Sequence, residues 1–249
     1  MPEGDAIHRA AKALRALEGD VVSAVSPHPR AAVLGVAERI DGKRLERVEA
    51  VGKNLLLSFE DGTVVRSHLR MNGRWRVEPA GRPILGKPWL VLRGESWQAV
   101  QRHGPVLELG RGRTALLGPD VMASPPDLVE MLARFRAADQ RRAVGEALLD
   151  QRLVAGIGNM WKAEALFGAE VSPWVPLREL SDERLLAVLS EAAALMQAPS
   201  RPRGRSAYRR AGRPCPRCGT AIRSWPQGDD ARMAYWCPSC QEGTEPRGA

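Results

Sequence analysis

The sequence predicts an α+β protein in which an N-terminal helix and an antiparallel β-sandwich precede a helical region and a small C-terminal hairpin. Three observations predict this class. The first half holds many short apolar runs separated by glycine turns, which is typical of an antiparallel sandwich or barrel. The second half holds longer segments with helical periodicity. All four cysteines fall in the last 35 residues, which sets the C-terminal segment apart.

The first half begins with a predicted helix at residues 6–17, which Gly19 ends. Turn dipeptides such as Asp61-Gly62 and Asn72-Gly73 then separate seven predicted strands. These strands cover residues 21–25, 44–51, 54–59, 63–69, 74–77, 89–92 and 97–101.

The pattern changes to helices after about residue 118, so we expect a domain boundary near residues 110–122. The predicted helices cover residues 127–137, 142–149, 159–167 and 182–198, and Ser181 is a suitable N-cap for the last of them. The expected domains are therefore residues 1–115, 120–205 and 210–245.

Composition and charge narrow the class of protein. The chain has 249 residues, 44% of them hydrophobic, and a formal net charge of +8. A basic balance favours a polyanionic partner, above all nucleic acid, although an arginine-rich composition alone produces the same charge. There is no run of about 18 apolar residues and no signal-peptide pattern at the start, so we expect a cytoplasmic protein that does not cross a membrane.

The cysteines form two Cys-x-x-Cys pairs, Cys215/Cys218 and Cys237/Cys240, with eighteen residues between the pairs. Two such turns complete a tetrahedron of thiolates around zinc. Two disulfides would require an oxidising compartment, and a thioredoxin-like site uses a single pair at a helix start. Four protein ligands close the site, so the expected cofactor is one structural zinc ion. The intervening residues read as strand, turn and strand, which predicts a zinc ribbon.

Three other segments carry possible chemistry. Removal of Met1 would leave Pro2 with a free secondary amine, which can attack a sugar C1′, and Glu3 beside it can pass protons. Such a terminus is more often only a frayed chain end. Lys53 lies on a tight turn between two strands, where it can contact phosphate or remain solvated.

The third segment is the glycine-rich stretch 150–161, in which Asn159 begins a helix and can present its amide to a phosphate. A plain helical hairpin is the alternative. Between the last predicted helix and the first cysteine, residues 199–214 hold six arginines and no acid, which predicts a loop ordered against an anion or a solvated linker. These arginines are Arg201, Arg203, Arg205, Arg209, Arg210 and Arg213.

Taken together, these segments resemble the formamidopyrimidine-DNA glycosylase/endonuclease VIII family over essentially the whole chain. The matching motifs are Pro2-Glu3-Gly4, Gly52-Lys53, residues 67–73 (SHLRMNG), residues 146–151 with 156–159 (EALLDQ and GIGN), residues 212–215 (GRPC) and residues 235–238 (YWCP). Gly4 in the first motif, where the formamidopyrimidine branch typically has leucine, makes the chain more similar to the endonuclease VIII branch.

The resemblance implies a bifunctional DNA glycosylase with abasic-site lyase activity that removes oxidised bases, with pyrimidines implied by the branch. It implies that Pro2 is the Schiff-base nucleophile, that Glu3 is the general acid/base, and that Lys53 assists elimination at the damaged-site phosphates. It also implies that Asn159 and Arg232 bind phosphates around the flipped nucleotide, with Arg232 counted among the catalytic residues as well.

Arg70 and Met71 fall in the segment that the family places against DNA, where Met71 would fill the gap left by the flipped base. The expected partner is double-stranded DNA with a damaged base or abasic site, bound by a monomer on the nucleoid of a bacterium. Asp5-Ala6 departs from the Pro-Glu common in the family, so a carboxylate near the site has shifted or gone. The alternative is a non-catalytic DNA-binding or damage-sensing protein of the same fold. A zinc-ribbon transcription factor is a weaker third reading, because it leaves Pro2, Glu3 and Lys53 unexplained.

Overall fold

The computed structural model describes residues 2–198, 204–241, 243, 245 and 246. The chain divides into two compact units, Met1–Leu116 and Leu117–Ala249. Among the described residues, no helix has the length and apolar character that crossing a bilayer requires. The position at which the predicted strands give way to predicted helices coincides with the boundary between these two compact units.

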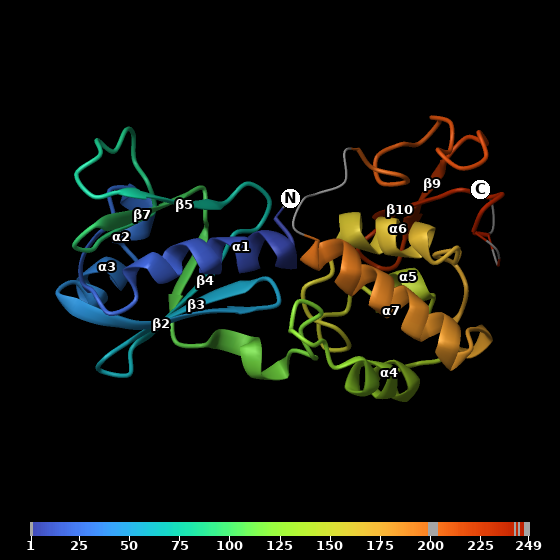
Figure 1. Ribbon diagram of the computed structural model, residues 1–249, viewed down its shortest axis with the longest axis horizontal. Helices are drawn as coiled ribbons and strands as arrows, with labels where there is room; N and C mark the ends of the chain where they lie inside the picture. The colour runs from blue at the N-terminus through green and yellow to red at the C-terminus, as the bar shows by residue number, and fades with distance from the viewer. Residues whose placement is uncertain (1, 199–203, 242, 244, 247–249) are drawn as a thin grey trace. The chain divides into compact units, whose positions relative to one another are not determined.

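Unit 1 contains three short or medium helices and eight strands (Figure 1). The helices are α1 (Gly4–Leu14), continued by a 3-10 turn (Arg15–Leu17), α2 (Pro29–Ala32) and α3 (Val36–Ile40). The strands are β1 (Val21–Val25), β2 (Lys43–Val51), β3 (Asn54–Phe59), β4 (Val64–His68), β5 (Arg74–Pro79), β6 (Leu90–Arg93), β7 (Trp97–Arg102) and β8 (Val106–Leu109). A second 3-10 segment, Gly112–Leu116, ends the unit.

The eight strands pair in the order β5-β7-β6-β1-β2-β3-β4-β8, and every pairing is antiparallel. Strands β1 and β2 meet through only two residue pairs, Val21 with Arg44 and Val22 with Lys43. The sheet therefore folds into two halves there. Residues of both halves, such as Leu57 on β3 and Leu92 on β6, belong to one buried core, which confirms the expected sandwich.

Helix α1 covers this core because one of its faces is apolar. Ile7, Ala11 and Leu14 recur at helical spacing and are buried. The helix packs against β2, β3 and β5, and Figure 1 shows that it begins at the end of unit 1 where the β2–β3 turn lies. The packing of α1 therefore holds its N-terminal residues at that end of the sheet.

Unit 2 is helical except for its last hairpin (Figure 1). Its elements are α4 (Leu128–Ala137), α5 (Val144–Ala147), α6 (Asn159–Gly168), a 3-10 turn (Leu177–Glu179), α7 (Asp182–Gln197), β9 (Arg223–Gln227) and β10 (Arg232–Trp236). Helices α6 and α7 pack on each other around a core that includes Trp161, Phe167 and Leu189. The Ser181 hydroxyl caps α7 by accepting a hydrogen bond from the Arg184 amide at 3.3 Å, as predicted.

The helix predicted at 142–149 was wrong at both ends, because only Val144–Ala147 is helical. Tertiary pairing explains the difference. Ala143 forms a β-bridge with Pro176, and the Arg142 carbonyl accepts from the Leu177 amide at 3.0 Å, so the first residues are drawn away from the helix. Helices α2 and α3 and strand β8 were not predicted.

Candidate functional site

The N-terminal end of α1 holds two buried carboxylates. Glu3, the N-cap residue, and Asp5 are each 1% exposed, while Pro2 is half-buried. Asp5 Oδ2 accepts from Arg9 Nη2 at 2.8 Å, one helical turn further on. The departure from the family pattern therefore places a buried carboxylate at position 5, where the positive end of the helix dipole stabilises it.

A cluster of cations surrounds His68 on the sheet of unit 1. His68 lies opposite Asn54, the residue after Lys53. Its Nδ1 accepts from the Arg70 amide at 3.0 Å, which leaves the proton of the neutral ring on Nε2. Burial, with the charges of Arg70, Arg66 and Lys53, lowers the pKa of His68 to about 4. A neutral donor among three cations suits an anion such as phosphate.

Met71, which the resemblance assigns to the gap left by the flipped base, lies on the loop between β4 and β5 and is 57% exposed. The loop is closed by a hydrogen bond from the Gly73 amide to the Leu69 carbonyl at 2.9 Å. A Cβ on Gly73 would lie 2.4 Å from that oxygen, so no side chain fits there. Leu69 is buried and Arg70 is exposed at φ +50°. The turn thus holds an apolar side chain out in solvent on a rigid base.

The two turns between α5 and α6 are held by one side chain. Gln151 Nε2 donates to the carbonyls of Leu149 and Ile157, each at 3.0 Å, and its Oε1 accepts from the Gly156 amide at 3.1 Å. Gly156 has φ +103°, a conformation that favours glycine. These contacts fix the start of α6.

Asn159 begins α6 and is 9% exposed. Its Nδ2 donates to the Met233 carbonyl on β10 at 2.9 Å. An amide nitrogen carries two hydrogens, so one remains for a further acceptor. Met233 directly follows Arg232 in the chain, so this contact brings two predicted phosphate-binding residues together at the hairpin.

The four cysteine sulfur atoms lie within 4.8 Å of one another, with Cys215 and Cys240 Sγ at 3.8 Å and Cys218 and Cys237 Sγ at 3.5 Å. Tetrahedral zinc with Zn–S bonds of about 2.3 Å places its ligand sulfurs about 3.8 Å apart. The geometry therefore fits a four-thiolate metal ion. Such an ion cross-links the base of the β9–β10 hairpin and leaves no position open for substrate.

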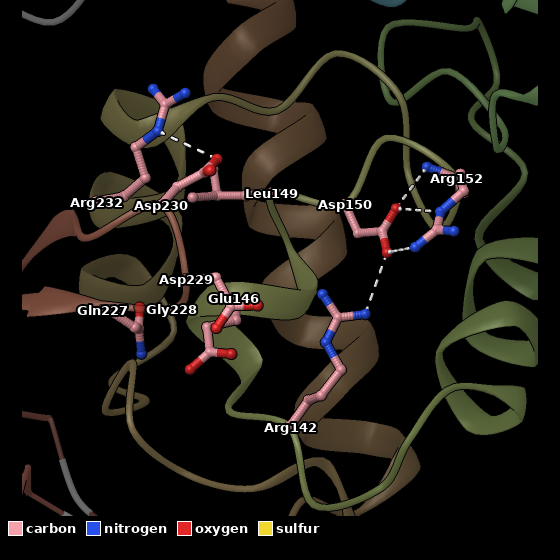
Figure 2. A pocket seen from close by; sticks show the side chains of 10 residues that line it. All are labelled: Arg142, Glu146, Leu149, Asp150, Arg152, Gln227, Gly228, Asp229, Asp230 and Arg232. Carbon is pink, nitrogen blue, oxygen red and sulfur yellow. Dashed lines mark hydrogen bonds and ion pairs between the residues drawn. The ribbon is translucent and has the colours of Figure 1, made fainter.

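Arg232 lies near the tip of this hairpin, 48% of its side chain is exposed, and its Nε is 3.8 Å from Asp230 Oδ2. It lines a cavity of about 540 Å³ together with Arg142 and Arg152 (Figure 2). Asp150 accepts from Arg152 Nη2 at 2.8 Å and from Arg142 Nη1 at 3.1 Å, and these contacts hold the pKa of its carboxyl well below the usual range. Of these three arginines, Arg232 was predicted as a site residue, whereas Arg142 and Arg152 were not.

The arginine-rich segment is described from residue 204 onward, so Arg201 and Arg203 lie outside the described residues. Tyr208 packs under two guanidinium groups, with Arg205 Cζ 4.9 Å and Arg209 Cζ 5.5 Å from the ring centroid. The Glu164 carboxylate of α6 accepts three backbone amides, from residues 206, 207 and 208, at 2.8–3.1 Å. This part of the segment is thus attached to the helical core.

The described units define a class of protein: a helix-capped β-sandwich unit and a helix-two-turn-helix unit with a four-cysteine hairpin. Residues 1–105 match the formamidopyrimidine-DNA glycosylase N-terminal domain, and residues 117–207 match the formamidopyrimidine-DNA glycosylase H2TH domain. The chain is 39% identical to the probable endonuclease 8 2 of Streptomyces coelicolor, over 99% of this chain and 96% of that protein.

A second curated relative and a solved structure are also similar to this chain. The DNA-(apurinic or apyrimidinic site) lyase Nei2 of Mycolicibacterium smegmatis is 33% identical over 97% of this chain and 99% of its own length. A crystal structure of Lactococcus lactis formamidopyrimidine-DNA glycosylase bound to abasic-site DNA has the same fold, with a TM-score of 0.80 and 22% identity over 97% of this chain and 100% of that one. The chain belongs to the formamidopyrimidine-DNA glycosylase/endonuclease VIII family of enzymes.

Proposed function

We propose that the protein is a bifunctional DNA glycosylase and abasic-site lyase of base-excision repair that acts on oxidised pyrimidines in double-stranded DNA. The observation that carries the proposal is the start of α1, where half-buried Pro2 precedes the buried carboxylate of Glu3. Relatives named endonuclease 8 and abasic-site lyase, aligned over nearly the whole chain, support it.

The chemistry starts once Met1 has been removed and the Pro2 nitrogen is a secondary amine. Its lone pair attacks C1′ of the damaged nucleotide, an N–C1′ bond forms and the nitrogen gives up its proton. The base leaves with the electrons of the glycosidic bond and takes up that proton. Glu3 delivers a proton to the ring oxygen as the sugar opens, which leaves an iminium between Pro2 and C1′. Loss of a C2′ proton then expels the 3′-phosphate, and water releases Pro2.

Contacts with DNA are assigned separately in each unit. In unit 1, Lys53 and the neutral His68 form an anion site, and Arg70 lies at the base of the adjoining loop. Met71 fills the space in the duplex, since an exposed unbranched apolar side chain can replace a lost stacking partner. In unit 2, Asn159 and Arg232 bind backbone phosphate.

A single zinc ion on Cys215, Cys218, Cys237 and Cys240 has a structural role in this proposal. The ion would cross-link the base of the β9–β10 hairpin and would take no part in the reaction. The three regions 1–115, 120–205 and 210–245 then act as catalytic domain, DNA-binding domain and finger. We place the protein as a monomer in the bacterial cytoplasm, bound to the nucleoid.

A panel of labelled duplexes tests the proposal. The panel has four duplexes: one with an oxidised pyrimidine, one with an oxidised purine, one with an abasic site and one without a lesion. The products of each reaction are separated before and after alkali treatment. We expect strand nicking without alkali at oxidised pyrimidines and abasic sites. Tight binding to the abasic duplex with no nicking of any duplex would contradict the proposal and favour the non-catalytic alternative.

A further inference from the structure

Lys162 is a lysine inside the core of unit 2, with 1% of its surface exposed. It lies on α6, one helical turn after Asn159. A buried ammonium group is costly unless hydrogen bonds or charges compensate it, and an apolar residue of similar size is often at least as stable in such a place. A stability role alone therefore does not account for a lysine here.

The ammonium group contacts the hairpin. Lys162 Nζ donates to Gln227 Oε1 at 3.3 Å, and Gln227 Nε2 donates to the Pro173 carbonyl at 2.8 Å. Gln227 is only 4% exposed. A Cβ at Gly145 would lie 2.4 Å from Gln227 Oε1, so the absence of a side chain on α5 makes room for this amide. Both ends of the Gln227 amide are thus held by the helical core.

Gln227 is the residue directly opposite Arg232 in the β9–β10 pairing. The cysteines lie at the other end of the hairpin, where Trp236, the neighbour of Cys237, pairs with Arg223. A metal ion on the cysteines fixes the base of the hairpin. The end that carries Arg232 is held by the Asn159–Met233 hydrogen bond on β10 and by the chain of contacts from Lys162 through Gln227 to Pro173 on β9.

We propose that Lys162 is a positioning residue that acts through Gln227 to hold Arg232 at the DNA phosphate. The inference rests on the proposed function, because it requires that Arg232 binds DNA. Arg232 is half exposed, and its guanidinium has a long 3.8 Å ion pair with the exposed Asp230 of the same hairpin, so the direction of the side chain depends on the backbone of β10. If the β10 backbone is already ordered in the free protein, less conformational entropy is lost when DNA binds.

A double-mutant cycle on the full-length zinc-loaded protein tests the inference. The affinity for a duplex with a stable abasic-site analogue is measured for wild type, Lys162→Met, Arg232→Ala and the double variant. Methionine keeps the unbranched length and removes the charge. Lys87→Met is the matched control, because it removes the same charge from an exposed position in unit 1.

We expect Arg232→Ala to weaken binding about 10-fold and to reduce the salt slope by about 1. Lys162→Met should weaken binding about 10-fold in the wild-type background and less than about twofold when Arg232 is absent. Zinc content should stay at one ion per chain in every variant, and Lys87→Met should bind like wild type.

Equal losses from Lys162→Met in both backgrounds would overturn the inference and leave the role of Arg232 intact. No effect of Arg232→Ala would overturn the DNA-binding assignment and the inference with it. If Lys162→Met does not fold, Gln227→Asn takes its place, since the shorter amide cannot span from β9 to Lys162. The same non-additivity with Arg232→Ala is then expected, and additive losses would again overturn the inference.

Discussion

Asn159 links the start of α6 to the β9–β10 hairpin, because its Nδ2 donates a 2.9 Å hydrogen bond to the Met233 carbonyl. The side chain that was expected to bind phosphate therefore also holds the strand that carries Arg232. In the proposed function, Asn159 therefore has two roles: its second amide hydrogen binds phosphate, and its contact with Met233 holds the hairpin that carries Arg232.

Replacement of Asn159 tests this double role. Asn159→Ala removes both hydrogen bonds and should weaken binding to an abasic-analogue duplex about 10-fold. Asn159→Asp should weaken it further, because a carboxylate cannot donate to the Met233 carbonyl and repels phosphate. Fluorescence anisotropy of a labelled duplex measures both affinities. Binding by Asn159→Asp that equals that of wild type would show that Asn159 contacts neither partner as described.

Shortening Met71 should separate base flipping from folding. Met71 is exposed, so Met71→Ala should change the free energy of unfolding by less than about 0.5 kcal/mol. It should lower kcat/KM on a lesion in duplex DNA about 10-fold, since the void left by the flipped base stays empty. Nicking of an abasic site in single-stranded DNA should be unchanged. Met71→Leu is the control, and equal losses on both DNAs would contradict the assignment.

Removal of the metal should abolish DNA binding while unit 1 stays folded. Elemental analysis should find one zinc ion per chain, and Cys218→Ser should lower this value and release the hairpin. Because the cysteines lie in unit 2, the buried sheet core of unit 1 should retain its hydrogen-exchange protection. Full activity of a zinc-free Cys218→Ser protein would show that the hairpin needs no metal.

His68 should make folding stability depend on pH below neutrality. Its pKa is lowered to about 4 in the folded protein, whereas an unfolded histidine titrates near the ordinary value of 6.5. Between these values the unfolded chain binds more protons, so the free energy of unfolding falls as pH drops from about 6.5 to about 4. His68→Gln should flatten this part of the profile in urea titrations. Identical profiles for the wild type and His68→Gln would contradict the assigned environment.

Much of the fold was predictable because local signals agree with tertiary packing. Strand β3 begins and ends at the predicted residues, since the run Asn54–Phe59 is bounded by the turns at Gly52-Lys53 and Asp61-Gly62. Strand β8 was missed because it has only four residues, and its pairing with β4 joins positions far apart in sequence, such as Arg66 and Glu108. Residues 106–109 form a strand because they pair with β4 in the folded sheet.

In the candidate site, too, some features are visible in the local sequence and others arise only from tertiary packing. The spacing of the cysteines alone predicts a metal site, and the glycines before Asn159 indicate that this residue begins a helix at a tight turn. The pKa of His68 is lowered first by burial and then by the charges of Arg70, Arg66 and Lys53. Arg66 and Arg70 are its near neighbours in the sequence, but its burial and the effect of Lys53 arise only in the folded sheet. Lys162 looks like a solvated lysine in the sequence, although its nearest neighbours on α6 are mostly apolar, and that pattern was the available signal.

Covalent trapping tests the central claim most directly. The processed protein and a form that retains one residue before Pro2 are incubated with abasic-site DNA and borohydride, and the adduct is located by mass spectrometry. The two proteins differ only in whether the Pro2 nitrogen is an amine or an amide. The account predicts an adduct on Pro2 in the processed form and none in the extended form. Equal trapping of both forms, or an adduct on a lysine such as Lys53, would contradict it.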